Sequence, residues 1–305
     1  MDTNFIKQQF HFEDFDHFAE MVGNGELEHA QLDLGRFQGS LIQIINGPVI
    51  LGVHKMNRTV LQQGFGLRGF TTFMIPGNME QRISWRKHVL RGNCIGILKS
   101  GMEHNAVTLP NLFGTPVSIS NDYLMELSVL LGYPNFTEFI RKHEMIVIDV
   151  NNAVKIQEMI VGLCNTKIFN ETMFTYELPK LIIRSISDLN KQDQKDFHTS
   201  PNLIFNKAQD YIHGNINENI HVLEICKEIG VSERNLRYVF NNKIGFGPKK
   251  YIDNLKLNKV RKELLMNGNE RVNILANKYG LWHAGKFASD YKRLFGELPS
   301  KTKNY

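Results

Sequence analysis

Short apolar segments, separated by Gly, Pro and Asn, make up the first part of the chain. Their length and their alternation of apolar and polar residues predict β-strands. We expect strands, after one short helix at 14–22, at residues 36–45, 48–56, 69–75, 93–99, 105–109 and 116–120. Many short strands with such turns are typical of a sandwich or small barrel, so we predict a barrel from about residue 25 to residue 120.

Helical patterns follow the strands. We predict helices at 122–132, 135–143, 152–164 and 178–190. The last two are amphipathic, and their apolar faces are larger than a lone helical pair can bury. Either a dimer seam with a second copy or packing against the barrel would cover these faces. The strands and these helices together form a predicted first domain, residues 1–190.

The segment "KQDQKDFHTSP", residues 191–201, is polar and ends in Pro, so we interpret it as a linker. A second domain, residues 202–305, then begins with a helix predicted at 202–215.

The stretch "GVSERNLRYVF", residues 230–240, divides into two faces when it is drawn as a helix. Arg234, Arg237, Tyr238 and Asn241 form one outward stripe, while Leu236 and Phe240 point the opposite way. An amphipathic helix is predicted just before it, at 222–229. Gly230 suits the end of that helix and Ser232 suits the N-cap of the next. The pattern is that of a helix-turn-helix unit, although an ordinary helical hairpin with a solvated charged face explains one such segment equally well.

A repeat within the second domain strengthens the helix-turn-helix interpretation. Gly230 is followed by Phe240, Gly245 and Pro248 at offsets of 10, 15 and 18, and Gly280 is followed by Tyr291, Gly296 and Pro299 at offsets of 11, 16 and 19. A helix predicted at 248–265 joins the two copies and would be about 27 Å long. With the flanking helices added, the two recognition helices could lie roughly one duplex turn apart, ~34 Å, and enter consecutive major grooves.

Composition agrees with a two-domain globular protein. The chain has 305 residues, of which 42% are hydrophobic and 22% charged. No apolar run is long enough to span a bilayer, and the polar, acidic N-terminus does not resemble a signal peptide. The three cysteines are widely separated, which favours reduced thiols and a cytoplasmic location.

Charge is distributed unevenly between the two domains. Residues 201–305 contain 18 Lys and Arg against 10 Asp and Glu, a net charge of +8. The first 200 residues contain 18 against 21, a net charge of −3. This asymmetry indicates a polyanionic partner for the C-terminal domain.

The C-terminal domain resembles the AraC/XylS family of transcription regulators. Its first half matches the family pattern at Gly230, Val231, Ser232, Arg234, Leu236, Phe240, Gly245 and Pro248. Its second half matches at Ile274, Ala276, Tyr279, Gly280, Phe287, Tyr291, Lys292, Phe295, Gly296, Pro299 and Ser300. The resemblance implies seven helices with two helix-turn-helix units, promoter DNA and RNA polymerase as partners, a homodimer, and activation of transcription.

The resemblance also implies which residues contact DNA. In the first unit they are Ser232, Arg234, Asn235, Arg237, Tyr238 and Asn241. In the second they are Trp282, His283, Gly285, Lys286, Ser289, Lys292 and Arg293. The first set is richer in groups that read bases, and the second is better suited to close approach and phosphate contact.

The N-terminal domain is similar to cupin-like sensory domains, in particular those of the subset that includes ethanolamine-operon activators. The similarity rests on "FQGSLIQI", residues 37–44, and on the order of the strands. Leu281 departs from that subset, which usually has Phe there. His54, His88 and His104 are isolated and form no HxH pair, so we expect no metal and no other cofactor.

Two groups of residues are candidates for effector binding. Arg82, Trp85 and Arg86 could hold an anionic or nucleotide effector by pairing with phosphate and stacking on a base, although a basic turn between strands explains them as well. Phe73, Met74 and Phe113 could line a pocket, although such residues are more often plain core.

These observations favour an α+β protein with a cupin-like barrel, a helical dimerisation segment and an all-α DNA-binding domain. We interpret it as a sequence-specific transcription regulator that responds to a small-molecule effector, and not as an enzyme. Two alternatives remain: a cupin-type enzyme with an appended DNA-binding domain, which would need clustered His and carboxylate ligands, and an effector-independent DNA-binding module.

Overall fold

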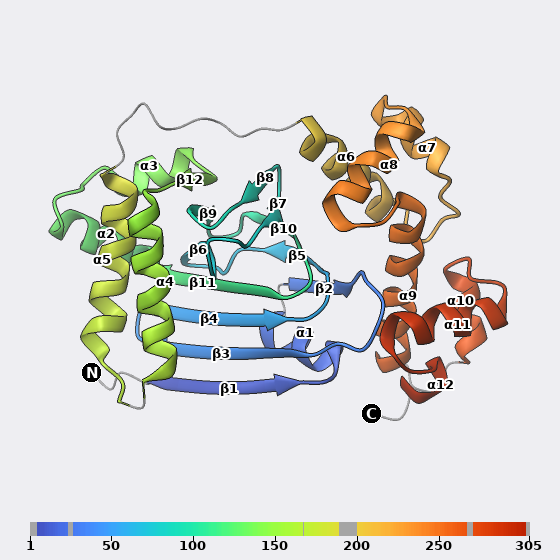
Figure 1. Ribbon diagram of the computed structural model, residues 1–305, viewed down its shortest axis with the longest axis horizontal. Helices are drawn as coiled ribbons and strands as arrows, with labels where there is room; N and C mark the ends of the chain where they lie inside the picture. Colours follow the sequence, from blue (N-terminus) through green and yellow to red (C-terminus); the bar gives the residue numbers. More distant parts are fainter. Residues whose placement is uncertain (1–4, 24–26, 167, 189–199, 267–270, 303–305) are drawn as a thin grey trace.

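The computed structural model describes residues 5–23, 27–166, 168–188, 200–266 and 271–302. An N-terminal domain of two β-sheets with helices is joined to an all-helical C-terminal domain (Figure 1). The predicted α+β class is confirmed. The predicted linker, 191–201, lies almost wholly outside the described residues, so the exact domain boundaries stay predictions.

Two antiparallel sheets face each other in the N-terminal domain. The larger contains, in spatial order, β1 (Ile6–Phe12), β3 (Gly39–Asn46), β4 (Val49–Met56), β11 (Leu112–Ser120), β6 (Phe70–Pro76), β9 (Cys94–Leu98) and β12 (Met145–Val147). The smaller contains β2 (Leu27–Gln31), β5 (Val60–Phe65), β10 (Glu103–Thr108), β7 (Ile83–Trp85) and β8 (His88–Leu90). Strands β1 and β12 lie outside the range predicted for the barrel and form the two edges of the larger sheet.

The side chains of the central strands point alternately to the two faces of the larger sheet, so one face packs on helices and the other faces the smaller sheet. In β4, Val49, Leu51 and Val53 belong to the core shared with helices, while Gly52 and His54 face a cavity between the sheets. Successive side chains of a strand point to opposite faces, so one strand serves both the helical layer and the cavity.

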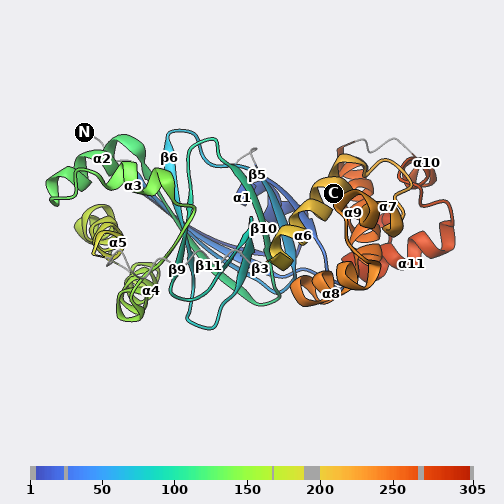
Figure 2. The ribbon, with the colours of Figure 1, turned by 90° about the horizontal axis from the view of Figure 1, so that it is seen from above.

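Helices cover the outer face of the larger sheet. They are α2 (Asn121–Leu130), α3 (Phe136–Lys142), α4 (Val150–Asn165) and α5 (Leu178–Ser187), while α1 (Phe15–Gly23) lies near β2. Figure 2 shows α2–α5 at one end of the sheets and the C-terminal helices at the other. Buried side chains of α4 and α5, such as Ile156, Ile160 and Ile182, pack into the same core as Leu51 and Val117. In this single chain many of those apolar side chains pack against the larger sheet, as in one of the two arrangements left open by the sequence.

The described part of the C-terminal domain has seven helices. They are α6 (Ser200–Gly214), α7 (Val222–Ile229), α8 (Glu233–Ile244), α9 (Pro248–Met266), α10 (Val272–Lys278), α11 (Ala284–Phe295) and α12 (Pro299–Thr302). Helix α9 begins at Pro248, as the sequence predicts, because the ring presets the helical φ and the missing N–H is not needed there. The departure at Leu281 is accommodated by packing against the core of the second unit.

The two domains are packed together through two contact areas. In the first, Leu61 and Val107 of the smaller sheet share a core with Phe205 and Ile212 of α6. In the second, the segment that follows β2 contacts α9 and α11. Side-chain groups there hydrogen-bond the backbone across the boundary: the Gln31 amide donates to the Leu294 carbonyl at 2.6 Å, and the Asn258 amide donates to the Gln31 carbonyl at 2.7 Å.

Arg261 of α9 is the charged centre of the second area. Its side chain is only 4% exposed. The guanidinium donates to Asp16 at 2.5 Å, to Asp14 at 2.9 Å and to Glu297 at 2.6 Å, and it lies over the Phe295 ring. Burial alone would lower the pKa of Arg261, but the carboxylates raise it instead, so the group stays charged. One side chain thus joins the N-terminal domain, α9 and the end of α11.

Replacing Arg261 by Met should lower the free energy of unfolding by about 3–5 kcal/mol, because three carboxylates would lose their shared buried cation. Chemical denaturation followed by circular dichroism would measure the loss. Adding Asp16→Asn should recover part of it. The control is Arg36→Met, which removes the exposed Arg36–Glu13 pair and should cost no more than about 1 kcal/mol. Equal losses for the two Arg→Met variants would contradict a structural role for Arg261.

Candidate nucleic-acid interface

The first helix-turn-helix unit consists of α7, a tight turn and α8. Gly230 ends α7 with a φ of 70°, a conformation that glycine adopts without a Cβ clash. The Ser232 hydroxyl caps α8 by accepting a hydrogen bond from the Asn235 backbone N–H at 3.2 Å. The turn and cap that the sequence predicts are both present, and they fix the direction in which α8 leaves α7.

Helix α8 presents the predicted polar stripe to solvent. Leu236, Val239 and Phe240 are buried in the domain core. The side chains on the other face are exposed, with Tyr238 at 61%: these are Ser232, Arg234, Asn235, Arg237, Tyr238 and Asn241. All six positions predicted for DNA contact in this unit are therefore open to a partner.

Helix α11 is the corresponding helix of the second unit. Phe287, Tyr291, Leu294 and Phe295 are buried, as expected of core residues. The predicted contact residues are exposed, with Trp282 at 63%: these are Trp282, His283, Gly285, Lys286, Ser289, Lys292 and Arg293. A Cβ on Gly285 would meet nothing within 4 Å, so packing inside the protein does not require this glycine. Its bare backbone is available for close approach by a partner.

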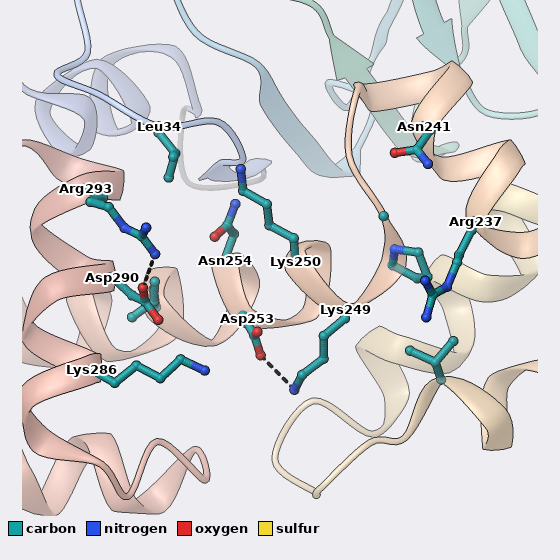
Figure 3. A pocket seen from close by; sticks show the side chains of 14 residues that line it. Leu34, Arg237, Asn241, Lys249, Lys250, Asp253, Asn254, Lys286, Asp290 and Arg293 are labelled. Carbon is teal, nitrogen blue, oxygen red and sulfur yellow. Dashed lines mark hydrogen bonds and ion pairs between the residues drawn. The ribbon is translucent and has the colours of Figure 1, made fainter. Parts of the chain in front are cut away.

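A cleft of about 520 Å³ lies between the two units. Helices α8 and α11 form its walls and the start of α9 forms its floor (Figure 3). The cationic side chains that line it are Arg237, Lys249, Lys250, Lys286 and Arg293, and the acidic ones are Asp253 and Asp290. The two helices that carry the predicted DNA contacts therefore open onto one shared, mainly basic surface.

Lys249 and Lys250 are cleft residues that we did not predict from the sequence. They follow Pro248 in the first turn of α9, directly between the two helix-turn-helix units. The signal that could have identified them is a pair of lysines at the start of the connecting helix. We treated that helix only as a spacer.

Most of the cations in and near the cleft are paired with a carboxylate on their own helix. Arg237 donates to Glu233 at 2.5 Å, and Lys249 donates to Asp253 at 3.0 Å. Arg293 is paired with Asp290. Within the described residues, no carboxylate forms an ion pair with Lys250 or Lys286, and the Lys250 ammonium lies 5.4 Å from the centre of the Phe246 ring.

The three residues suggested for an anionic effector do not form one site. Trp85 is fully buried, and its indole N–H donates to Nδ1 of His104 at 3.2 Å. Arg86 donates to the Glu103 carbonyl and lies 3.6 Å from a Glu144 oxygen. Arg82 is exposed at the surface. Trp85 therefore offers no exposed ring face for stacking, and Arg86 shares the Glu144 carboxylate with Lys87.

A cavity lies between the two sheets. The cavity there has a volume of about 280 Å³. Its polar lining includes Gln43, His54, Gln62, Thr72, His104 and Ser118, and its apolar lining includes Ile50, Met74 and Leu112. Of the three suggested pocket residues, Met74 lines this cavity, whereas Phe73 is buried in the core shared with the helices.

Three buried imidazoles between the sheets, those of His29, His54 and His104, have pKa values well below neutral pH. Burial lowers the pKa of His54 and of His104 to about 4. Burial and, less strongly, the two neighbouring imidazoles lower the pKa of His29 to about 3. Since the Trp85 indole donates to Nδ1 of His104, the proton of neutral His104 sits on Nε2. The cavity thus offers neutral hydrogen-bonding groups rather than charges.

Among the described residues, no three His, Cys, Asp or Glu side chains meet in an arrangement that could hold a metal ion. None of the described helices combines the length and the apolar character that crossing a bilayer requires.

Comparison with known proteins places the similarity mainly in the C-terminal domain. A family model described as a helix-turn-helix domain matches residues 225–305. The XylDLEGF operon transcriptional activator 1 of Pseudomonas putida is 34% identical over 116 residues, which cover 37% of this chain and 35% of that protein. The "Probable thc operon regulatory protein" of Rhodococcus erythropolis is 33% identical over 96 residues, which cover 31% and 29%. The chain thus spans about a third of the length of these relatives.

A solved structure, that of the AraC-like transcriptional activator CuxR, covers 84% of this chain and 96% of its own at 13% identity, with a TM-score of 0.44.

His54→Gln should make stability less sensitive to acid. The folded-state pKa of about 4 is below the usual 6.5, so the unfolded chain binds more protons between these pH values. The parent's free energy of unfolding should be intact above pH 6.5 and should fall towards pH 4, by about 1–3 kcal/mol from this one residue. Urea unfolding at a series of pH values would show a shallower fall for His54→Gln than for the exposed control His11→Gln. Identical pH profiles for the two variants would contradict burial of His54.

Proposed function

We propose that this chain is a transcription regulator of the AraC/XylS type that binds promoter DNA with both helix-turn-helix units. The match of residues 225–305 to a helix-turn-helix family model and the similarity to operon activators support this proposal. The observation that carries the proposal is the shared basic cleft onto which α8 and α11 open. An ordinary helical hairpin with a solvated face needs no second helix-turn-helix unit. Here a second unit is present, and its α11 opens onto the same cleft as α8. Operon regulators and activators among the relatives favour a regulator over a cupin-type enzyme.

We propose that the two recognition helices contribute differently. Helix α8 offers Arg234, Arg237 and Tyr238, and a guanidinium can pair with both acceptors of a guanine. Helix α11 offers Gly285 and short side chains, with cations at its edges. On this account α8 supplies most of the base preference, while α11 mainly fixes the position of the duplex through its phosphates.

We further propose that the N-terminal domain is a sensor whose effector occupies the cavity between the sheets. An uncharged small molecule with hydrogen-bonding groups fits the neutral lining of that cavity. Charged ligands suit it less, because burying an unpaired charge is costly. The alternative, an anionic effector held by Arg82, Trp85 and Arg86, has less support, since Trp85 is buried and Arg86 lies beside Glu144.

A short route connects the cavity with the first recognition helix. In β7, Trp85 points inward to His104, and the preceding residue, Ser84, points outward. The Ser84 hydroxyl accepts a hydrogen bond from the Lys243 ammonium of α8 at 3.1 Å. The Lys243 side chain is partly buried at the domain boundary, and this burial lowers its pKa to about 8. A change in the cavity could therefore reach α8 through adjacent residues of one strand.

The remaining expectations are proposals that rest on resemblance. They are a homodimer, contact with RNA polymerase, activation rather than repression, a cytoplasmic location, and sensory-domain kinship with ethanolamine-operon activators. Most apolar side chains of α4 and α5 pack within the chain, so a dimer would use apolar side chains that remain exposed, such as Val150 and Val161 of α4. The exposed Met125, Val129 and Leu130 of α2 are also available.

Arg237→Ala should flatten base preference in one half of the binding site and cost about 1–3 kcal/mol on the best sequence, because a bidentate contact to guanine is lost. Lys292→Ala should weaken binding evenly across sequences, because only a phosphate contact is lost. Binding to a library of single-base variants of a selected site at two salt concentrations would separate the two effects. If Lys292→Ala erased preference at a defined base and Arg237→Ala did not, the assigned roles of α8 and α11 would be reversed.

Met74→Trp should fill part of the cavity, abolish binding of the effector and leave DNA binding intact. Native mass spectrometry of gently purified protein would detect a carried small molecule in the parent and its loss in the variant, and a reporter gene would show loss of the response. Met79→Trp is the matched control, since it makes the same exchange at an exposed position that does not line the cavity. A full response from Met74→Trp would place the effector elsewhere.

A further inference from the structure

We propose that the cleft between the two units holds the sugar–phosphate backbone of the duplex, and that Asp253 and Asp290 keep this contact weak. The proposal rests on the proposed DNA-binding function and extends it to Lys249, Lys250 and Arg293, cleft residues to which no base contact is assigned. On this account Lys249, Lys250 and Arg293 bind phosphates, and the two carboxylates oppose that binding by holding two of the three cations.

The position of the cleft selects the duplex backbone as its occupant. A duplex that receives α8 and α11 in consecutive major grooves turns the minor groove between them towards the protein. The phosphates that border that groove would then face the floor of the cleft, where Lys249 and Lys250 lie in the first turn of α9 (Figure 3). A phosphate backbone is the polyanion expected to meet a surface with five cationic side chains.

The carboxylates in the cleft are unusual in a surface meant for a polyanion. Asp253 on α9 and Asp290 on α11 both line it, and each is paired with a cation of its own helix. The Lys249 side chain is 65% exposed and the Arg293 side chain 64% exposed. Such solvated pairs are weak, so an incoming phosphate can take over the cation. The carboxylate then stays close to the phosphate as a like charge.

Two cations in the cleft differ from the paired ones. Lys250 and Lys286 form no ion pair with a described carboxylate, so they can bind phosphate without displacing a partner. Lys250 can therefore bind a phosphate of any duplex directly. For Lys249 and Arg293, a phosphate has to displace the carboxylates of Asp253 and Asp290, respectively. Because Lys249, Lys250 and Arg293 would contact phosphates and not bases, the loss or gain of their contacts should change affinity alike for every DNA sequence.

Binding of the full chain to a selected site and to an unrelated duplex tests the proposal, with salt titrations of each. Asp253→Asn should raise affinity for both duplexes by about three- to fivefold at low salt, and should steepen the salt dependence, because Lys249 becomes free. Lys250→Ala should weaken binding to both and lower the salt slope by about one. In a Lys249→Ala background, Asp253→Asn should have a smaller effect than in the parent.

The sensory domain provides matched controls. Lys142 and Glu138 of α3 form an exposed pair with the same i,i+4 spacing as Lys249 and Asp253. Glu138→Gln and Lys142→Ala change the net charge by the same amounts but lie outside the C-terminal domain, so they should leave binding nearly unchanged. If Asp253→Asn and Lys250→Ala behaved like these controls while Arg237→Ala still altered base preference, the cleft proposal would fail and the proposed function would stand. If the parent bound no duplex DNA, the proposed function itself would fail.

Discussion

The buried guanidinium of Arg261 determines how the parts of this protein are held together. It bonds to Asp14 and Asp16 of the N-terminal domain and to Glu297 just after α11, and it belongs to α9, which joins the two helix-turn-helix units. A cation buried in this way is stable only where its partners are all in place, because desolvation otherwise exceeds the attraction. The contact therefore couples the position of the N-terminal domain to that of α11 in the second helix-turn-helix unit. Backbone hydrogen bonds reinforce it, such as that from the Gly35 N–H to the Arg293 carbonyl at 2.9 Å.

Helix α8 of the first helix-turn-helix unit has its own connection to the N-terminal domain. Apolar residues of the smaller sheet share a core with α6, and Lys243 of α8 bonds to Ser84. The smaller sheet thus supports the first helix-turn-helix unit through α6 and α8. The segment after β2 supports the second unit through α9 and α11. Because the inner face of the same small sheet lines the cavity, a ligand there would press on the sheet that supports α8.

Local signals explain which features could be predicted from the sequence. Gly230, Ser232 and Pro248 act within one turn of chain, so the ends of α7, α8 and α9 could be placed without knowing the fold. Strand β1 escaped prediction because it is an edge strand with mostly exposed residues and little apolar alternation. The partners of Arg261 could not be foreseen, since Asp14 lies 247 residues away in the sequence. The same limit applies to Trp85, whose basic neighbours suggested an exposed ring, whereas its partner His104 holds it inside the barrel.

Hydroxyl-radical footprinting of the full chain on a selected DNA site most directly tests the central claim, that one chain places two recognition helices in consecutive major grooves. The account predicts two protected windows on one face of the duplex, separated by about one helical turn, with the phosphates between them also protected. The account would be contradicted if only one window of about half a helical turn were protected, and if Ser289→Glu on α11 left that protection unchanged.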